Sequence, residues 1–468
     1  MASAAKLLQN EEREVAPLST EGTLHPIVAT FMVVILNTGV APLTLPFGFE
    51  RGGWLLALFL FPVCGLTSLI SGTFVVETLS ICNAMRLVAG PSADYNELVK
   101  SDRRKEPHDY FLREPLEYSQ LASMLLPPFW SLVVRIITCI YIGGACTIWV
   151  VAIGNTMGTF FEHTVGSHTR DTAYYSALLV ALMFEVPLTM MGLSGTKGLQ
   201  MMMVTVRISA IVVMDAVAIW RVFTTDVNSF EDSNFTGVDF DGLKYLYGSA
   251  VFTLLWHYSI GSVVAPIRPQ RSIFKVLVAG TGGMTVFFTL HCLLLAVVWA
   301  KPAQAGIEDL INENYLVYGK AWLVLGLYPM LVSIAFPIIA GNLRNNLLTV
   351  VNIDLKALPA ERQFRAKLIG TLIAVMFPFA IGLITHDVQI IIAINAGFNG
   401  FLIQFIFPAV FLLQARKLQK IVLSPENSSS DIGEKKPLRT PMAADFVVYL
   451  VIFWGVFGIC AQAYISNR

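Results

Sequence analysis

Two polar segments interrupt long apolar runs in this sequence, and each combines helix-breaking residues with groups that bind small polar molecules. The first is Asn37-Thr38-Gly39-Val40, with Pro42 and Pro46 close behind it. The second is Trp256-His257-Tyr258-Ser259-Ile260-Gly261-Ser262. Glycine tolerates unusual backbone dihedrals and proline lacks an N–H group, so both segments predict a broken helix. The N–H groups freed at such a break bind a carboxylate and the freed carbonyls bind a cation, which suits a zwitterion.

The apolar runs around these segments predict that membrane-spanning helices position them. Of 468 residues, 55% are hydrophobic and 14% are charged, and the mean hydropathy is +0.65. This composition is far from the average of soluble proteins. Because a span needs about 20 apolar residues, we predict eleven spans, at 25–49, 54–84, 130–156, 172–192, 198–221, 244–265, 273–300, 319–341, 366–385, 387–414 and 443–465.

The basic residues predict the orientation of the chain in the membrane. With a cytoplasmic N-terminus, the inside segments hold 23 Lys and Arg residues and the outside segments hold 7, which follows the positive-inside bias. The 32 basic and 32 acidic residues give no net charge, so the expected partner is the lipid bilayer and not nucleic acid. The sequon at Asn234 lies in an outside loop and is a glycosylation candidate. The plasma membrane and a lysosomal or endosomal membrane both fit this pattern.

The chain divides into two similar halves with polar segments outside them. We expect a disordered cytoplasmic arm without a cleavable signal at 1–22, a five-helix repeat at 23–222, a non-cytoplasmic loop at 223–243, a second five-helix repeat at 244–415, a cytoplasmic linker at 416–442, and an eleventh helix with its tail at 443–468. Each repeat begins with a suspected broken helix, which is the pattern of an inverted repeat. The alternative is that glycine and proline only kink these helices or help them pack.

Ionisable residues inside the predicted spans are few, and their cost in the membrane makes each a functional candidate. They are Glu77, Arg135, Glu185, Arg207, Asp215, His257 and His291. Glu77 is a candidate proton carrier, and an interhelical pair with Arg135 or Arg207 explains it equally well. Asp215 follows Arg207 by about two helical turns, so both fit an internal network on one helix face.

The two intramembrane histidines differ in their expected roles. His257 lies in the second break and is the better candidate for substrate contact, whereas His291 is expected to be a polar packing contact.

The sequence holds no H-E-x-x-H motif, no Walker-type lysine loop and no Ser-His-Asp set. We therefore expect no enzyme activity, no catalytic residue, no metal site and no cofactor.

Several motifs resemble the amino acid/auxin permease family, within the amino-acid–polyamine–organocation superfamily. The opening signature is matched by Thr38-Gly39-Val40, Leu45-Pro46-Phe47-Gly48-Phe49 and Gly52-Gly53-Trp54. Ala335-Phe336-Pro337 and Phe405-Ile406-Phe407-Pro408-Ala409-Val410-Phe411 are similar to the eighth and tenth spans, so the resemblance covers residues 25 to 415. The chain looks closest to the eukaryotic transmembrane protein 104 branch through Thr73-Phe74-Val75-Val76-Glu77, Phe336-Pro337-Ile338-Ile339-Ala340, Leu343-Arg344-Asn345-Asn346 and Thr385-His386-Asp387.

This resemblance implies an all-α polytopic membrane protein with about 11 transmembrane helices, namely a LeuT-like five-plus-five inverted repeat plus one extra helix. It implies proton- or sodium-coupled symport of an amino-acid substrate. By the same resemblance, the substrate-binding residues are Asn37, Thr38, Gly39, Val40, His257, Tyr258 and Ser259. The resemblance adds Ser333 and Asn342 as candidates for a sodium site, beside Glu77 as the candidate for a coupling proton. The chain departs from the family where Trp256-His257-Tyr258 replaces a frequent Cys-His-Pro sequence.

Three functions from different classes are compatible with the sequence. Secondary active amino-acid transport is favoured by the paired breaks. A non-transporting amino-acid sensor or membrane scaffold with the same fold is the alternative, with the polar arm and the loop between Leu87 and Pro128 as the parts that contact a partner. A channel or lipid-handling protein is disfavoured because the sequence has no ring of like charges and no repeated pore helix. The sequence identifies no protein partner.

Overall fold

The structure is a computed structural model that is helical almost throughout. It describes residues 24–90, 93–100, 110–224, 236–299, 306–318, 336–353, 355, 358–423, 438–442 and 444–466. The helical elements are α2 Pro26–Thr38, α3 Ala41–Gly52, α4 Trp54–Ala89, α5 Tyr95–Val99, α6 Tyr118–Leu125, α7 Pro128–Thr164, η1 Ser167–Thr169, α8 Arg170–Thr224, α9 Leu243–Thr253, η3 His257–Ser259, α10 Ile260–Val264, η4 Gln270–Ser272, α11 Ile273–Leu277, η5 Val278–Gly282, α12 Gly283–Trp299, η6 Ile311–Tyr318, α15 Phe336–Val350, α16 Ala360–Gly382, α17 Val388–Ile394, η9 Asn395–Gly400, η10 Leu402–Ile406, α18 Phe407–Val422 and α19 Asp445–Ser466.

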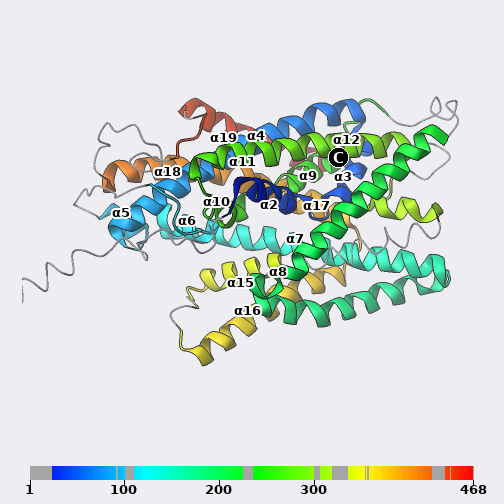
Figure 1. Cartoon of the computed structure of the whole chain (residues 1–468), viewed down its shortest axis with the longest axis horizontal. Coiled ribbons are helices and arrows are strands. Elements are labelled where there is room, and N and C mark those ends of the chain that lie inside the picture. Colours follow the sequence, from blue (N-terminus) through cyan, green and yellow to red (C-terminus); the bar gives the residue numbers. More distant parts are fainter. Residues whose placement is uncertain are drawn as a thin grey trace, which may run out of the picture.

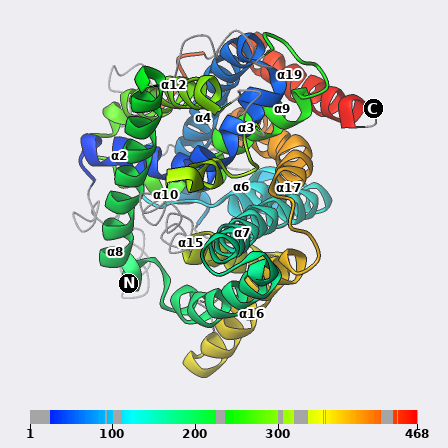
Figure 2. The ribbon, with the colours of Figure 1, turned by 90° about the vertical axis from the view of Figure 1, so that its right-hand side faces the viewer.

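The long helices run side by side and form one bundle. In Figure 1 they lie along the long axis, with α5 and α6 at the end that is predicted to be cytoplasmic. The end-on view in Figure 2 shows α3, α4, α9 and α12 on one side of the bundle and α7, α15 and α16 on the other. The first broken helix therefore lies on the same side as α9, and α7 faces both from across the bundle.

Within the described ranges, seven helices are long and apolar enough to cross a membrane. They are Trp54–Ala89, Pro128–Thr164, Arg170–Met191, Gln270–Trp299, Ala360–Gly382, Val388–Val422 and Asp445–Ser466. The predicted first and sixth spans do not appear among them because each is divided into short pieces at its break. The predicted fifth span, 198–221, is not among them either, and it is the later part of α8. The predicted eighth span, 319–341, lies largely outside the described residues. The multi-pass helical architecture is confirmed, while the number eleven stays a prediction.

The predicted fourth and fifth spans are parts of one continuous helix, α8. Its backbone is helical from Arg170 to Thr224, and Figures 1 and 2 show that it changes direction between two arms. The first arm includes the candidate span Arg170–Met191, and the sequence directly after it, Gly192-Leu193-Ser194-Gly195, is rich in glycine and serine. Neighbouring serine and glycine are a frequent cause of sharp helix bends. The two spans are thus separated by a bend and not by a loop.

The two broken helices pack against each other through α3 and α9. A Cβ added to Gly48 of α3 would lie 3.0 Å from the Leu246 Cα of α9, and the rings of Phe47 and Tyr245 meet edge to face with centroids 5.4 Å apart. Because Gly48 has no side chain, the backbones of α3 and α9 approach closely at this point. The two breaks are thereby held next to each other inside the bundle.

Candidate functional site

The first break separates α2 from α3 at Gly39 and Val40. Helix α2 ends at Thr38 and α3 begins at Ala41, and the Val40 carbonyl accepts the N–H groups of Leu43 and Thr44 at 2.9 and 3.3 Å. Val40 is buried. Pro42 has no N–H group, so the backbone N–H groups of Val40 and Ala41 are the ones that precede the first bond inside α3, in the position of a helix N-terminus. This arrangement suits a carboxylate.

The second break separates α9 from α10. Helix α9 ends at Thr253, and the chain then passes through an unwound turn and the short η3 before α10 begins at Ile260. The Leu254 carbonyl of this turn accepts hydrogen bonds from Ser68 Oγ at 2.8 Å and from Gln404 Nε2 at 3.0 Å. Backbone groups at membrane depth must be satisfied within the protein. The side chains of α4 and η10 therefore stabilise the unwound turn.

His257 is fully buried in this second break. Its Nε2 lies 2.9 Å from Ser71 Oγ and 3.1 Å from the Ser68 carbonyl oxygen. A carbonyl only accepts, so the contact with Ser68 places the proton on Nε2 and leaves Nδ1 as an acceptor. Within the described residues, Nδ1 is buried without a hydrogen-bond partner. A buried acceptor of this kind next to a helix break is suited to bind an ammonium group.

Aromatic side chains of α7 line the side of the bundle that faces both breaks. A Cβ on Gly39 would lie 3.5 Å from Trp149 Cζ2, and Tyr141 packs edge to face on Tyr258 with ring centroids 5.9 Å apart. The guanidinium carbon of Arg207 lies 5.8 Å from the centre of the Trp149 ring. Two α7 residues that the sequence analysis did not select, Tyr141 and Trp149, thus contact the predicted site.

Of the remaining predicted site residues, some lie at the second break, one lies on α15, and the others are outside the described residues. Ser259 is buried, and Tyr258 is half-buried. The Asn37 and Thr38 side chains, together with Ser333 and Asn234, lie outside the described residues. Asn342 is half-buried on α15, where its carbonyl accepts from Asn346 at 2.8 Å. The structure therefore brings Gly39 and Val40 together with the η3 residues, and places Asn342 on a separate helix.

Glu77 of α4 forms an ion pair, as one of the two sequence interpretations proposed. Its partner is Arg416 of α18 and not Arg135 or Arg207, with nitrogen–oxygen distances of 2.8 and 3.1 Å. The Thr440 backbone N–H also donates to the Glu77 carboxylate at 2.8 Å. The ion pair therefore joins α18 to α4, and the bond from Thr440 anchors the segment before α19 to α4.

Replacing Arg416 with glutamine is expected to destabilise the protein by about 2 kcal/mol. Loss of one partner of a fully buried pair costs roughly 3–5 kcal/mol, and the Arg416 side chain keeps 20% of its surface exposed. The fall in melting temperature of the purified protein measures the effect. Arg365→Gln is the matched control, because its pair with Glu361 is exposed at 73% and 78% and contributes less than about 1 kcal/mol. Equal melting temperatures for both variants would contradict this role of Arg416.

A polar cavity of about 340 Å³ lies where the end of α7 meets the start of α8, at the end of the bundle away from α5 and α6. Its lining residues come from α7, α8, the segment 306–318 and the turn before α17, and they are Asn155, Gly158, Arg170, Asp171, Tyr174, Glu308, Asp309, Glu313, His386 and Asp387. Burial, together with repulsion from Asp387 and Glu308, raises the pKa of Asp309 to about 6. Burial raises the pKa of Glu313 to about 7, against a hydrogen bond from Thr159 that lowers it.

The packing of the segment 306–318 is expected to weaken as the pH rises from about 4.5 to about 7. A carboxyl group whose pKa is raised on folding stabilises the packed state while protonated, and that contribution is lost as the pH rises through the raised value of about 7 at Glu313. Hydrogen exchange of this segment, corrected for intrinsic rates, should therefore quicken over this range. Glu313→Gln, which mimics the protonated acid, should weaken this dependence. An unchanged pH profile in that variant would contradict the assignment.

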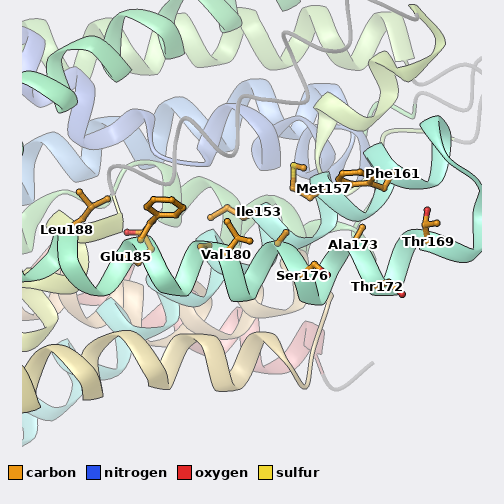
Figure 3. Close-up of a pocket in the computed structure, with 13 residues that line it drawn as sticks. Ile153, Met157, Phe161, Thr169, Thr172, Ala173, Ser176, Val180, Glu185 and Leu188 are labelled. Carbon is orange, nitrogen blue, oxygen red and sulfur yellow. The ribbon is translucent and has the colours of Figure 1, made fainter.

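The larger cavity lies between α7 and the first arm of α8 and has a volume of about 760 Å³. Figure 3 shows its lining, which is mostly apolar and includes Ile153, Met157, Phe161, Val180 and Leu188, with Glu185 among them. Glu185 suits the ammonium group of a zwitterion, but the described residues of the lining include no Lys or Arg to pair with its carboxylate. This cavity is therefore a poorer candidate for an amino-acid site than the paired breaks.

Comparison with known proteins agrees with the helical architecture. Residues 21–426 match the profile of the family described as transmembrane amino acid transporter protein. The chain is similar to transmembrane protein 104 homolog of Caenorhabditis briggsae, at 24% identity over 94% of this chain and 96% of that protein. It is also similar to transmembrane protein 104 of Homo sapiens, at 22% identity over 90% of this chain and 92% of that protein.

A solved structure has the same fold. The crystal structure of MhsT in complex with L-phenylalanine superposes with a TM-score of 0.56, covering 92% of this chain and 98% of that chain at 12% sequence identity. At this identity the likeness concerns the fold alone. It confirms the predicted class, an all-α polytopic membrane protein with a LeuT-like arrangement.

Proposed function

This chain belongs to the transmembrane amino acid transporter protein family, and from that premise we propose that it is a secondary active transporter of amino acids. It moves its substrate by alternating access, with a coupling ion that supplies the free energy. The observation that carries the proposal is the pair of helix breaks, at Gly39 and at His257, which lie next to each other and face the same wall of α7.

The amino acid binds between the two breaks. Its carboxylate contacts the N–H groups at the start of α3, together with the residues Asn37, Thr38, Gly39 and Val40. Its ammonium group contacts the second break, where His257 Nδ1 and the hydroxyl groups of Tyr258 and Ser259 are acceptors. The positive end of the α3 dipole and the acceptors of η3 give the two ends of a zwitterion different partners. That polarity supports an amino acid as the substrate class.

The same broken helices allow the site to open alternately to either side. Each break divides a span into two pieces that need not move together, and the pieces of the first helix pair with those of the second. On the predicted outer side, α3 packs on α9 through Gly48. On the predicted inner side, the Leu24 N–H donates to the carbonyl of Pro266, just beyond α10, at 2.8 Å. Movement of these pairs against α7 and its neighbours exposes the site to one side at a time.

Uptake into proteoliposomes tests this proposal. The full chain is reconstituted, a panel of amino acids is offered, and pH and sodium gradients are applied separately. We expect saturable uptake of at least one amino acid that rises with one of the gradients and is inhibited by unlabelled substrate. The absence of gradient-dependent flux for the whole panel, from protein shown to be folded by its melting transition, would contradict transport. Saturable binding without flux would instead favour a sensor.

A further inference from the structure

Three polar groups from three helices meet beside the first break. They are His291 of α12, Asp215 in the second arm of α8, and the backbone carbonyl of Pro42 in the first turn of α3. His291 Nδ1 lies 2.6 Å from Asp215 Oδ1, and His291 Nε2 lies 3.2 Å from the Pro42 carbonyl oxygen. The His291 side chain has no exposed surface, and that of Asp215 is 20% exposed. Ionisable groups in such a position are costly in a membrane and indicate function.

The Pro42 carbonyl needs a partner because of the local sequence. In an α-helix, the carbonyl of residue 42 accepts the N–H of residue 46, and here residue 46 is Pro46, which has no N–H group. His291 Nε2 supplies the missing donor. A carbonyl oxygen cannot donate, so this contact fixes a proton on Nε2. The first turn of α3, which begins one residue before Pro42, is therefore tied to α12 through the imidazole.

The geometry also sets the number of protons that the pair holds. The Nδ1 lone pair and the Asp215 carboxylate are both acceptors, so their 2.6 Å contact requires one proton between them. With the proton on Nε2, the pair holds two protons and is neutral as a whole. If one proton leaves, either the two acceptors face each other or the Pro42 carbonyl loses its donor. Both hydrogen bonds of His291, to Asp215 and to the Pro42 carbonyl in the first turn of α3, therefore form only when the pair holds two protons.

The surroundings of the pair contain few competing charges. On α12, Cys292 lies close enough to interact with the Asp215 charge, and the ring of Phe287 stacks on His291. Beside Asp215, the Met214 carbonyl accepts from the Tyr315 hydroxyl at 2.9 Å. The charged residues that flank Asp215 most closely along α8 are Arg207, which lies over Trp149, and Arg221, which lies over Trp299. On α3, Glu50 and Arg51 lie at the far end of the helix.

We propose that His291 and Asp215 are the proton-binding site that couples proton entry to amino-acid transport. Binding of one proton completes the contacts with Asp215 and Pro42 and holds the N-terminus of α3 in position for the substrate carboxylate. Release of that proton frees the first turn of α3 and favours release of the substrate. This inference rests on the proposed transport function, and it places the coupling ion at neither Glu77 nor Asn342.

The variants Asp215→Asn and His291→Gln test the proposal in proteoliposomes. The side-chain amide introduced by Asp215→Asn can donate to Nδ1 of a neutral imidazole, so the hydrogen bonds persist although the titratable carboxyl group is removed. A pH gradient of one unit allows about tenfold accumulation with one proton per substrate, and we expect accumulation only in the wild type. Exchange of labelled for unlabelled substrate at equal pH should persist in Asp215→Asn.

Asp241→Asn and His163→Gln, both exposed, are the matched controls and should accumulate substrate. Full pH-driven accumulation in Asp215→Asn would overturn the proposal.

Infrared difference spectroscopy on the purified full chain tests the pair independently of transport. Between acidic and neutral pH, the wild type should show a carboxyl band that is absent from Asp215→Asn and imidazole bands that are absent from His291→Gln. If these bands appear but no amino acid is taken up by the wild type, the transport function fails and the proton site stands. If the wild-type bands persist in both variants, the proton site is wrong whether or not amino acids are transported.

Discussion

Replacing Gly39 with leucine is expected to lower the rate of amino-acid uptake about 100-fold without unfolding the protein. A Cβ at this position would meet Trp149 Cζ2 at 3.5 Å, which is an ordinary contact distance. The additional atoms of a leucine side chain extend beyond that contact into the break, where the substrate carboxylate is proposed to bind. Initial rates of uptake into proteoliposomes, with the melting temperature measured in parallel, give the result.

Gly39→Ala is the matched control for this substitution. A single methyl group fits at 3.5 Å from Trp149, so uptake by this variant should stay within about threefold of the wild type. Gly282→Leu is a second control, since a Cβ at Gly282 would meet no atom within 4 Å. Uptake by Gly39→Leu at the wild-type rate would show that the substrate does not use the first break.

Replacing His257 with glutamine is expected to raise the KM for the amino acid about 10- to 100-fold. The amide nitrogen of glutamine can take the place of imidazole Nε2 and keep the contacts with Ser71 Oγ and the Ser68 carbonyl. No atom replaces the Nδ1 acceptor. Loss of one hydrogen bond to a charged group costs about 1.5–3 kcal/mol, which corresponds to this change in affinity. The KM is measured from the initial rate of uptake into proteoliposomes at a series of amino-acid concentrations.

His257→Asn and Ser71→Ala separate a binding role from a packing role. Asparagine places an acceptor near the Nδ1 position but cannot reach Ser71, so it should bind substrate better than glutamine does. Ser71→Ala removes the hydroxyl partner of Nε2 and leaves Nδ1 unchanged, so its KM should stay within about threefold of the wild type. A larger rise in KM for Ser71→Ala than for His257→Gln would assign His257 to packing alone.

The helix breaks were predictable from sequence because their causes are local. Gly39, Pro42 and Pro46 change the backbone at their own positions, and so do the polar residues of the η3 segment. Apolar runs likewise predict membrane helices without knowledge of their neighbours. For these reasons the fold class and the position of both breaks agree with the structure.

The partners of the ionisable residues were not predictable because they come from distant parts of the chain. Glu77 pairs with Arg416, 339 residues away, and not with Arg135 or Arg207. His291, interpreted as a packing contact, binds Asp215, 76 residues away, and the Pro42 carbonyl. One signal was present for the second case: Pro46 leaves the carbonyl four residues earlier without a donor. Sequence spacing cannot identify which helix supplies that donor.

The wall of the site on α7 also depends on tertiary packing. Tyr141 and Trp149 lie about two turns apart in an apolar run, which by itself is the pattern of an ordinary packed helix. Only the approach of Gly39 to Trp149 and of Tyr258 to Tyr141 distinguishes them. Similarly, the bend of α8 reads in sequence as a short loop between two spans, since glycine and serine favour both.

A structure of the purified protein with its transported amino acid bound is the most direct test of the proposed site. We predict that the substrate carboxylate lies within hydrogen-bonding distance of the backbone N–H groups at the start of α3, and that its ammonium group lies next to His257 Nδ1. Binding of the amino acid in the cavity between α7 and α8, or in the polar cavity at the end of the bundle, with neither break in contact, would contradict the account.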